Sequence, residues 1–266
     1  MSRIAILGGG SWGTALAIML SRGRRKHEIS LWVHDRALAD SIRHDRENRR
    51  YLPGHRLDPN VSITSEIGDA ISGAQILIGA VPTAHARAVY SAAAASIPTR
   101  SIFVSAAKGL EPATHKRMSE VVFEVFSRES APRLAVLSGP SFAAEVARGE
   151  PTAVVLASSD ASLAAELQEE FAAPNFRVYT NDDVLGVELA GAMKNVIAIA
   201  AGVCQGLGLG SNPLAALITR GLAEMSRLAA AVGDYRQRRR KRSSLGYHLE
   251  TVAFSPPGNR ASGVAA

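Results

Sequence analysis

Three glycines near the start of the chain have a spacing that suits the binding of phosphate groups. Gly8, Gly10 and Gly13 follow the apolar run Ile4–Leu7 and lead into Thr14–Leu20, a segment typical of a helix. Between a strand and a helix, the first glycine permits a tight turn, the second lets the backbone approach a pyrophosphate, and the third lets the helix pack on the sheet. The helix N-terminus adds free N–H groups and a partial positive charge. The sequence therefore predicts a dinucleotide-binding loop, with a plain glycine-rich turn as the alternative.

Two lysines could carry charge or protons beside such a ligand. Lys194 lies in a segment that is apolar on almost all sides. An unpaired ammonium is costly there, and burial lowers the pKa of a lysine towards values useful for proton transfer. Lys108 follows the strand-like run Ile102–Ser105, where it could bind a phosphate or polarise a carbonyl. The alternatives are a structural lysine at 194 and an ordinary surface lysine at 108.

Other polar residues follow predicted strands or lie on a predicted helix. The string Ser-Gly-Pro-Ser at 138–141 offers hydroxyl groups, although a plain turn is the commoner explanation. Asp35 could bind the ribose 2′-hydroxyl of NAD, whereas His34 and Arg36 could receive the 2′-phosphate of NADP. The sequence leaves this choice open. Arg220 could bind a phosphate, or it could be a solvated helix residue.

The elements that must position these residues alternate between strand and helix through the first half of the chain. The predicted strands are Ile4–Leu7, Ile29–Val33, Ile76–Ala80, Ile102–Ser105 and Arg133–Leu137. The predicted helices are Thr14–Arg22, Asp35–Arg46, Ile67–Ile71, Ala84–Ala95 and Thr114–Phe126. This order predicts a parallel sheet with helices on both faces, and a ligand crevice at the carboxyl ends of the strands.

The second half of the chain changes character. Strands at Thr152–Ala157 and 178–180 and a helix at Ala161–Ala172 complete a predicted first domain of residues 1–180. Two long apolar segments, Asp182–Gly206 and Asn212–Val232, then predict buried helices of a partial all-α domain at residues 181–233. Small residues that recur at helical spacing on the first of these helices, from Gly191 to Gly202, predict close helix packing.

The composition argues against several other classes of protein. The net charge of +6 comes from Arg236–Arg242, which holds six cations with no interleaved aromatic residues, so a nucleic-acid binder ranks last. The one cysteine, Cys204, excludes an internal disulfide, and the histidines lack metal-ligand spacing. The longest apolar stretch contains Lys194, and Ile4–Leu7 leaves no room before it for a signal peptide. We expect a cytoplasmic, metal-free protein without a membrane span.

Seven strings taken together resemble the soluble, bacterial-type NAD(P)-dependent glycerol-3-phosphate dehydrogenases. The resemblance covers roughly residues 1–233 in the family's order. The strings lie at 8–15 (GGGSWGTA), 48–54 (NRRYLPG), 81–83 (VPT), 107–111 (AKGLE), 137–143 (LSGPSFA), 186–202 and 215–225 (AALITRGLAEM).

This resemblance implies a Rossmann-like domain followed by an all-α substrate domain of the 6-phosphogluconate-dehydrogenase type, here incomplete. It implies reversible hydride transfer between NAD or NADP and the pair of sn-glycerol 3-phosphate and dihydroxyacetone phosphate, for glycerophospholipid synthesis. Lys194 would be the catalytic acid/base and would touch the substrate. The resemblance also implies a cofactor site at Gly8, Gly10, Ser11, Trp12, Gly13, His34, Arg36, Lys108 and Ala143, and substrate contacts at Lys108, Gly139 and Ser141.

Residues 234–266 depart from the family pattern. They have no sustained periodicity, and the family's Gly-Asp-Leu and Ser-Arg-Asn segments, which would contact substrate and nicotinamide, are not found there. We expect a disordered basic tail, and we hypothesise that a frameshift replaced the family's C-terminal segment. An NAD(P)-binding remnant with little or no turnover is therefore the main alternative to an active enzyme. A related reductase of another small acid or ketone is a further alternative, and the resemblance leaves the oligomeric state open, a homodimer included.

Overall fold

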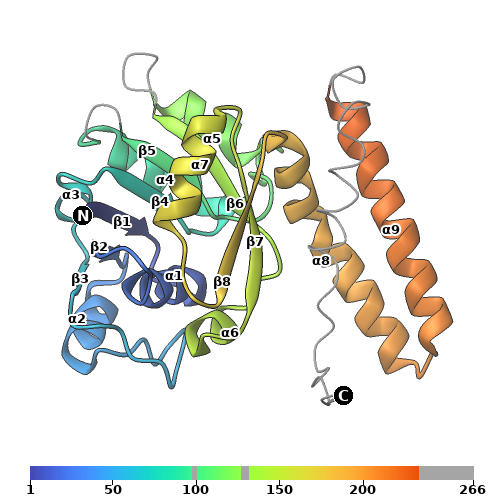
Figure 1. Ribbon diagram of the computed structural model, residues 1–266, viewed down its shortest axis with the longest axis horizontal. Helices are drawn as coiled ribbons and strands as arrows, with labels where there is room; N and C mark the ends of the chain where they lie inside the picture. The colour runs from blue at the N-terminus through green and yellow to red at the C-terminus, as the bar shows by residue number, and fades with distance from the viewer. Residues whose placement is uncertain (98–100, 127–131, 234–266) are drawn as a thin grey trace.

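The computed structural model describes residues 1–97, 101–126 and 132–233 (Figure 1). A sheet flanked by helices fills the first part of this region, and a hairpin of two long helices stands beside it. The tail predicted to be disordered, residues 234–266, lies outside the described residues.

One eight-stranded sheet forms the centre of the molecule, in the order β3-β2-β1-β4-β5-β6-β7-β8. Every neighbouring pair is parallel except β6 and β7. The order reverses between β1 and β4, which in open sheets of this kind marks the ligand crevice. The strands are β1 (Ser2–Leu7), β2 (His27–Trp32), β3 (Val61–Thr64), β4 (Ile76–Gly79), β5 (Ile102–Ser105), β6 (Arg133–Ser138), β7 (Thr152–Ala157) and β8 (Phe176–Asn181).

The prediction of a parallel sheet is confirmed for the five strands predicted in the first half of the chain, and the antiparallel pair brings in β7, whose direction was not predicted. The only helix between β6 and β7 is α6 (Ala143–Arg148), whose six residues rise about 9 Å, whereas a six-residue strand spans about 20 Å. The connection therefore stays at one edge of the sheet, and β7 runs back along β6. Hydrophobic periodicity locates a strand but does not specify its direction.

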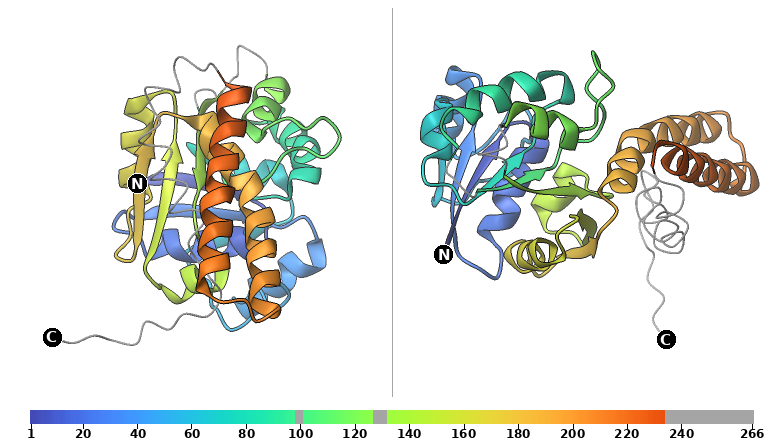
Figure 2. Two further views of the ribbon diagram at one scale, coloured as in Figure 1. Left: turned by 90° about the vertical axis from the view of Figure 1, so that its right-hand side faces the viewer. Right: turned by 90° about the horizontal axis from the view of Figure 1, so that it is seen from above.

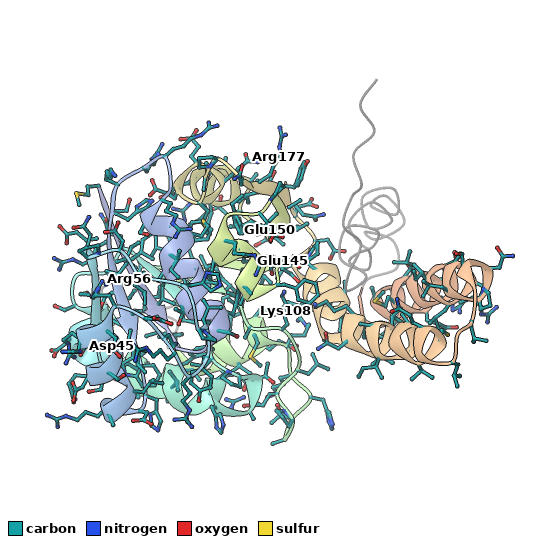
Figure 3. All side chains as sticks on the ribbon, turned by 90° about the horizontal axis from the view of Figure 1, so that it is seen from below. Asp45, Arg56, Lys108, Glu145, Glu150 and Arg177 are labelled. Carbon is teal, nitrogen blue, oxygen red and sulfur yellow. The ribbon has the colours of Figure 1, made fainter. Side chains whose placement is uncertain are left out.

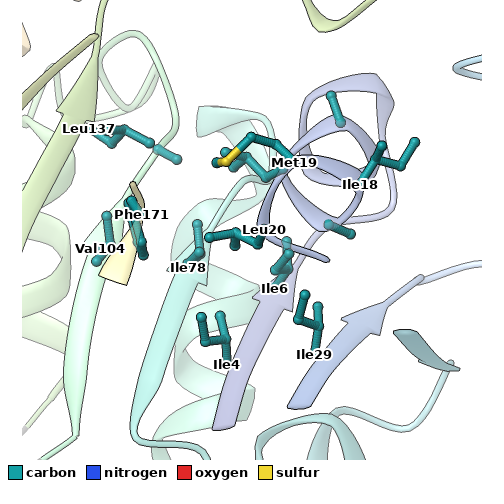
Figure 4. Close-up of a cluster of buried hydrophobic side chains, with 14 of the residues drawn as sticks. Ile4, Ile6, Ile18, Met19, Leu20, Ile29, Ile78, Val104, Leu137 and Phe171 are labelled. Carbon is teal, nitrogen blue, oxygen red and sulfur yellow. The ribbon is translucent and has the colours of Figure 1, made fainter. Parts of the chain in front are cut away.

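Helices cover both faces of the sheet, as predicted. On one face lie α1 (Ser11–Ser21), α2 (Arg36–Asp45), α6 and α7 (Ala161–Glu170), and on the other lie α3 (Ile67–Ile71), α4 (Thr83–Ala94) and α5 (Met118–Val125). Side chains alternate along β1. Ile4 and Ile6 join the core under α1 (Figure 4), whereas Ala5 and Leu7 join the core under α4.

The sequence analysis missed two elements and misplaced the start of a third. Strand β3 is only four residues long and α6 only six, and neither was predicted. Helix α5 begins at Met118 rather than Thr114, because residues 110–117 double back and Leu110 forms an antiparallel bridge with Arg117. Elements this short offer too few residues for a periodic pattern.

The helical hairpin consists of α8 (Val184–Gly206) and α9 (Ser211–Val232), which pack on each other beside β6 and β7 (Figure 2). The prediction that both helices are buried is wrong for much of their length. Residues 186–191 of α8 are buried, but Val196, Ile199 and Val203 are more than half exposed. Only the first turns of α8 reach the sheet, and in the described part of the chain the later turns have α9 alone as a neighbour.

The packing predicted from the small residues of α8 is confirmed at one end only. A Cβ at Gly191 would lie 2.8 Å from the Ser138 hydroxyl, whereas Gly202 has open space around it. The close crossing of the two helices occurs instead at Gly221 of α9, where a Cβ would lie 2.5 Å from Ile197. Helix α8 is long and apolar enough to cross a membrane, with a mean hydropathy of 1.6, but one such helix is weak evidence and its first turns pack on the sheet. Residues 1–97, 101–126 and 132–233 therefore contain no clear membrane span.

Candidate active site

The glycine loop has the geometry that its spacing predicts. Gly8 has a φ of +127°, and a Cβ there would lie 2.8 Å from the Ala80 carbonyl oxygen at the end of β4. A Cβ at Gly13 would lie 1.9 Å from the Gly8 carbonyl oxygen, so this glycine is required where α1 meets the loop. Gly10 has no neighbour within 4 Å. The open space at Gly10 lies at the N-terminus of α1, where a phosphate could approach.

The side chain of Asn48 holds this loop in place through hydrogen bonds. This side chain is fully buried, and its amide donates hydrogen bonds to the Gly9 carbonyl oxygen (2.9 Å) and to the Thr14 hydroxyl (2.8 Å). Its carbonyl oxygen accepts from the Tyr51 N–H. The sequence analysis quoted this asparagine only as part of a family string. No local pattern shows that a polar residue some forty positions away will bond to the glycine loop.

Lys108 lies at the border between the sheet and α8 (Figure 3). Its ammonium donates to the Gly139 carbonyl oxygen and to the Ser141 hydroxyl, both at 2.9 Å. It also lies 5.5 Å from the centre of the Trp12 ring, whose indole N–H donates to the Ala106 carbonyl oxygen. Residues from three loops at the carboxyl ends of β1, β5 and β6 therefore meet at one ammonium group, as the parallel part of the sheet predicts.

The charges of Lys108 and Lys194 act on each other. Burial and, to a smaller degree, the positive charge of Lys194 together lower the pKa of Lys108 to about 7. Burial also lowers the pKa of Lys194, which is half-buried at the end of the anchored part of α8. In the described residues the Lys194 ammonium makes no hydrogen bond or ion pair. Two mutually repelling cations with lowered pKa values are an arrangement typical of functional sites.

The residues predicted to choose between NAD and NADP lie together at the end of β2. His34, Asp35 and Arg36 are all exposed there. One carboxylate oxygen of Asp35 accepts from the Leu38 N–H and caps α2, and the other lies 3.3 Å from the Arg50 guanidinium. Asp35 is therefore engaged on both oxygens, while the guanidinium of Arg36 is exposed to solvent.

Ala143 and Arg220 complete the set of predicted candidates. Ala143 is the first residue of α6 and follows the loop that holds Ser141, so it lies on the same side of the sheet as α1. Arg220 is exposed on α9, and its charge acts on Glu224 one turn further along that helix. Within the described residues no contact joins Arg220 to the two lysines.

The loop and lysines fit a dinucleotide with a nicotinamide end. A Cβ would fill the space at Gly10 where a pyrophosphate would lie, and the backbone N–H groups at the start of α1 are suited to its oxygens. Trp12, which follows this loop at the start of α1, brings Lys108 next to it. Fold and site together define a Rossmann-type, dinucleotide-dependent oxidoreductase with a helical second domain.

Comparison with known proteins identifies the family. Residues 3–164 match the N-terminal domain, and residues 183–258 the C-terminal domain, of NAD-dependent glycerol-3-phosphate dehydrogenase. The chain belongs to this family. The second match extends beyond residue 233, where the sequence analysis ended the resemblance, so that boundary was wrong.

Individual relatives agree with this assignment. The chain is 47% identical over 264 residues to a glycerol-3-phosphate dehydrogenase [NAD(P)+] of Koribacter versatilis, covering 99% of this chain and 78% of the relative. It is 49% identical over 268 residues to the enzyme of the same name from Acidobacterium capsulatum, covering 99% and 79%. The crystal structure of glycerol-3-phosphate dehydrogenase from Coxiella burnetii matches with a TM-score of 0.80 and 39% identity, over 87% of this chain and 70% of that one.

Proposed function

We propose that this protein interconverts dihydroxyacetone phosphate and sn-glycerol 3-phosphate with NAD or NADP as the hydride carrier. The observation that carries the proposal is the meeting of Lys108 with Trp12, Gly139 and Ser141 beside the glycine loop, with Lys194 close enough to lower the pKa of Lys108. The names of the relatives supply the substrate and both cofactors.

The two lysines have different proposed roles because their ammonium groups are held differently. The Lys108 ammonium donates one hydrogen bond to the Gly139 carbonyl oxygen and one to the Ser141 hydroxyl, and these two bonds fix its position. It would orient the substrate and place positive charge beside the carbonyl oxygen that becomes negative during reduction. Lys194 makes no such bond in the described part of the chain, so its protons are available for transfer.

Lys194 would therefore give a proton to the oxygen on C2 during reduction and take it back during oxidation. Burial lowers the pKa of Lys194, which makes its ammonium a better acid than that of an exposed lysine. The bound nicotinamide supplies the hydride to C2 of dihydroxyacetone phosphate, or accepts it in the reverse direction. The ketone would thus gain one hydride and one proton.

The remaining proposed contacts with the cofactor are assigned from where each residue lies in the fold. Gly8, Gly10, Ser11, Trp12 and Gly13 would hold the pyrophosphate and the adjoining ribose, His34 and Arg36 the adenosine end, and Ala143 the nicotinamide side. We propose that the chain acts in the cytoplasm as a homodimer, supplying glycerol 3-phosphate for glycerophospholipids. The exposed apolar side chains of α8 and α9 favour association of two copies.

An assay on the purified protein tests the main proposal. Addition of dihydroxyacetone phosphate should oxidise NADPH or NADH. The reaction is monitored by the loss of absorbance of the reduced nicotinamide. A parallel titration of the cofactor, followed by the fluorescence of Trp12 and Trp32, separates binding from turnover. Cofactor binding without turnover would replace the proposal by the alternative of a nucleotide-binding remnant.

A further inference from the structure

Glu188 is a buried carboxylate that the proposed mechanism does not use. It lies on α8, six residues before Lys194, and only 6% of its side chain is exposed. Six helical residues separate the two side chains by about 9 Å along the axis and by about a third of a turn around it. Glu188 therefore cannot serve Lys194 as a direct partner, and its contacts are with another part of the molecule.

Those contacts join α8 to the start of α5. One oxygen of Glu188 accepts from the backbone N–H of Ser119 at 2.8 Å. The other accepts from the Ser119 hydroxyl at 2.6 Å and from the Arg117 guanidinium at 2.9 Å. Ser119 is the second residue of α5, where backbone N–H groups lack a partner within the helix and a negative charge is favoured.

Arg117 connects this contact to the loop of the other lysine. It forms an antiparallel bridge with Leu110, two residues after Lys108. The next residue, Glu111, is held by two hydrogen bonds of 2.8 Å from Arg87 on α4, and its backbone N–H donates to the Lys116 carbonyl oxygen. The segment that carries Lys108 is thus fixed to the same short hairpin that receives Glu188.

The rest of α8 offers little else to fix its orientation. Gly191 sits against Ser138 and Val187 joins the small core of Val136, Val155 and Ala157, but from Asn195 onward much of the helix surface is exposed. Lys194 lies where the anchored part ends. A rotation or a shift of α8 would therefore move its ammonium relative to that of Lys108.

We propose that Glu188, through Ser119 and Arg117, is a positioning residue that sets the distance between the Lys194 and Lys108 ammonium groups. The proposal rests on the proposed function for its effect on turnover, but not for its effect on the lysine pair. Removing a buried carboxylate that accepts three hydrogen bonds leaves the Ser119 N–H and hydroxyl without this acceptor and leaves Arg117 paired within its own segment, with Ser119 and Glu120, so α8 loses this polar attachment to the sheet domain.

The experiment compares three variants of the full chain. Glu188→Gln keeps the shape and the acceptor for the Ser119 N–H but removes the charge. Ser119→Ala removes the two hydrogen bonds of the hydroxyl, to Glu188 and from Arg117, without changing a charge. Glu120→Gln is the matched control, because Glu120 also pairs with Arg117, at 3.2 Å, but its side chain is 45% exposed and no hydrogen bond or ion pair joins it to α8 in the described residues. Circular dichroism and thermal unfolding check that each variant is folded.

Turnover gives the first measurement. We expect Glu188→Gln to lower kcat by about 10²-fold, Ser119→Ala by roughly fivefold, and Glu120→Gln not at all, since misplacement by an ångström can cost about 10²-fold. The Kd for NADPH should change by less than about twofold in all three, because the glycine loop is braced separately by Asn48. A purely structural role would lower the Tm of Glu188→Gln while leaving kcat of the folded protein unchanged.

The titration of Lys108 gives a second measurement that does not need turnover. Competitive acetylation over a range of pH, followed by mass spectrometry, reports the pKa of individual lysines. If α8 moves away, water and the loss of the Lys194 charge both raise the pKa of Lys108 from about 7 in Glu188→Gln, while Glu120→Gln leaves it unchanged. An unchanged Lys108 titration in folded Glu188→Gln would overturn the inference. Absence of turnover in the wild type would instead overturn the proposed function and leave this measurement intact.

Discussion

The two regions of the molecule that meet at the candidate site are held in place to very different degrees. In the sheet domain, the glycine loop is fixed by Asn48, and Lys108 has two hydrogen bonds and the Trp12 ring around it. In the helical hairpin, Lys194 lies on a helix that is buried for little more than its first two turns. We therefore propose different roles for the two regions. The sheet domain holds a dinucleotide by itself, whereas turnover depends on how α8 is attached to the sheet domain.

The largest expected effect separates the two regions directly. Lys194→Ala should lower kcat by roughly 10²- to 10⁴-fold, the usual contribution of a general acid, while the Kd for NADPH changes little. Steady-state kinetics and a fluorescence titration measure both quantities. The exposed Lys26→Ala serves as the control. Full turnover in Lys194→Ala would remove this lysine from the proposed mechanism.

Two glycines of the binding loop provide a matched pair inside the sheet domain. Gly13→Ala places a Cβ 1.9 Å from the Gly8 carbonyl oxygen, so we expect a fall in Tm together with loss of NADPH binding. Gly10→Ala meets no atom within 4 Å and should leave the Tm unchanged, but it should weaken NADPH binding by about tenfold or more, because the added methyl group occupies the approach of the pyrophosphate. Normal NADPH affinity in Gly10→Ala would place the cofactor elsewhere.

The buried ammonium of Lys108 should make the stability of the sheet domain depend on pH. Its pKa is about 7 in the folded chain and 10.5 when exposed, so the unfolded chain binds more protons between these values. The cost of burying the charge is fully present below pH 7 and declines as the pH rises to 10.5. We therefore expect wild type to gain stability relative to Lys108→Met as the pH rises. The free energy of unfolding of Lys108→Met minus that of wild type should fall by a few kcal/mol over this range, as measured by urea titrations. For the control Lys26→Met, this difference in the free energy of unfolding should not depend on pH. The same result for Lys108→Met would show that Lys108 is not buried as a cation.

The smallest expected effect lies on the exposed face of the hairpin. Ile199 is 69% exposed and Ile18 of α1 is 1% exposed. Ile199→Ala should change the free energy of unfolding by less than about 0.5 kcal/mol, whereas Ile18→Ala should cost about 2–5 kcal/mol. Equal losses in the two variants would mean that the Ile199 face is covered in solution, and sedimentation of both variants would then show whether a second copy covers it.

The sequence predicted most of the sheet domain because its signals are local. The strand–glycine–helix order around Gly8 and the strand-end position of Lys108 each depend on neighbouring residues, and the structure confirms them. The reversal of β7, the bond from Asn48 to Gly9 and the exposure of α8 were not predicted. Each of these depends on residues that are distant in the chain, and an apolar helix has the same periodicity whether or not another element covers it.

What the sequence determined by itself is therefore the chemistry available: a glycine loop for phosphates, lysines beside apolar residues, and an alternating order that places strand ends together. Only the tertiary structure decided how close these groups lie. The lowered pKa of Lys108 needs both burial by the β1, β5 and β6 loops and the charge of Lys194 on α8. Electrostatic interaction depends on distance and solvent exposure, which exist only once the sheet domain and α8 are packed together.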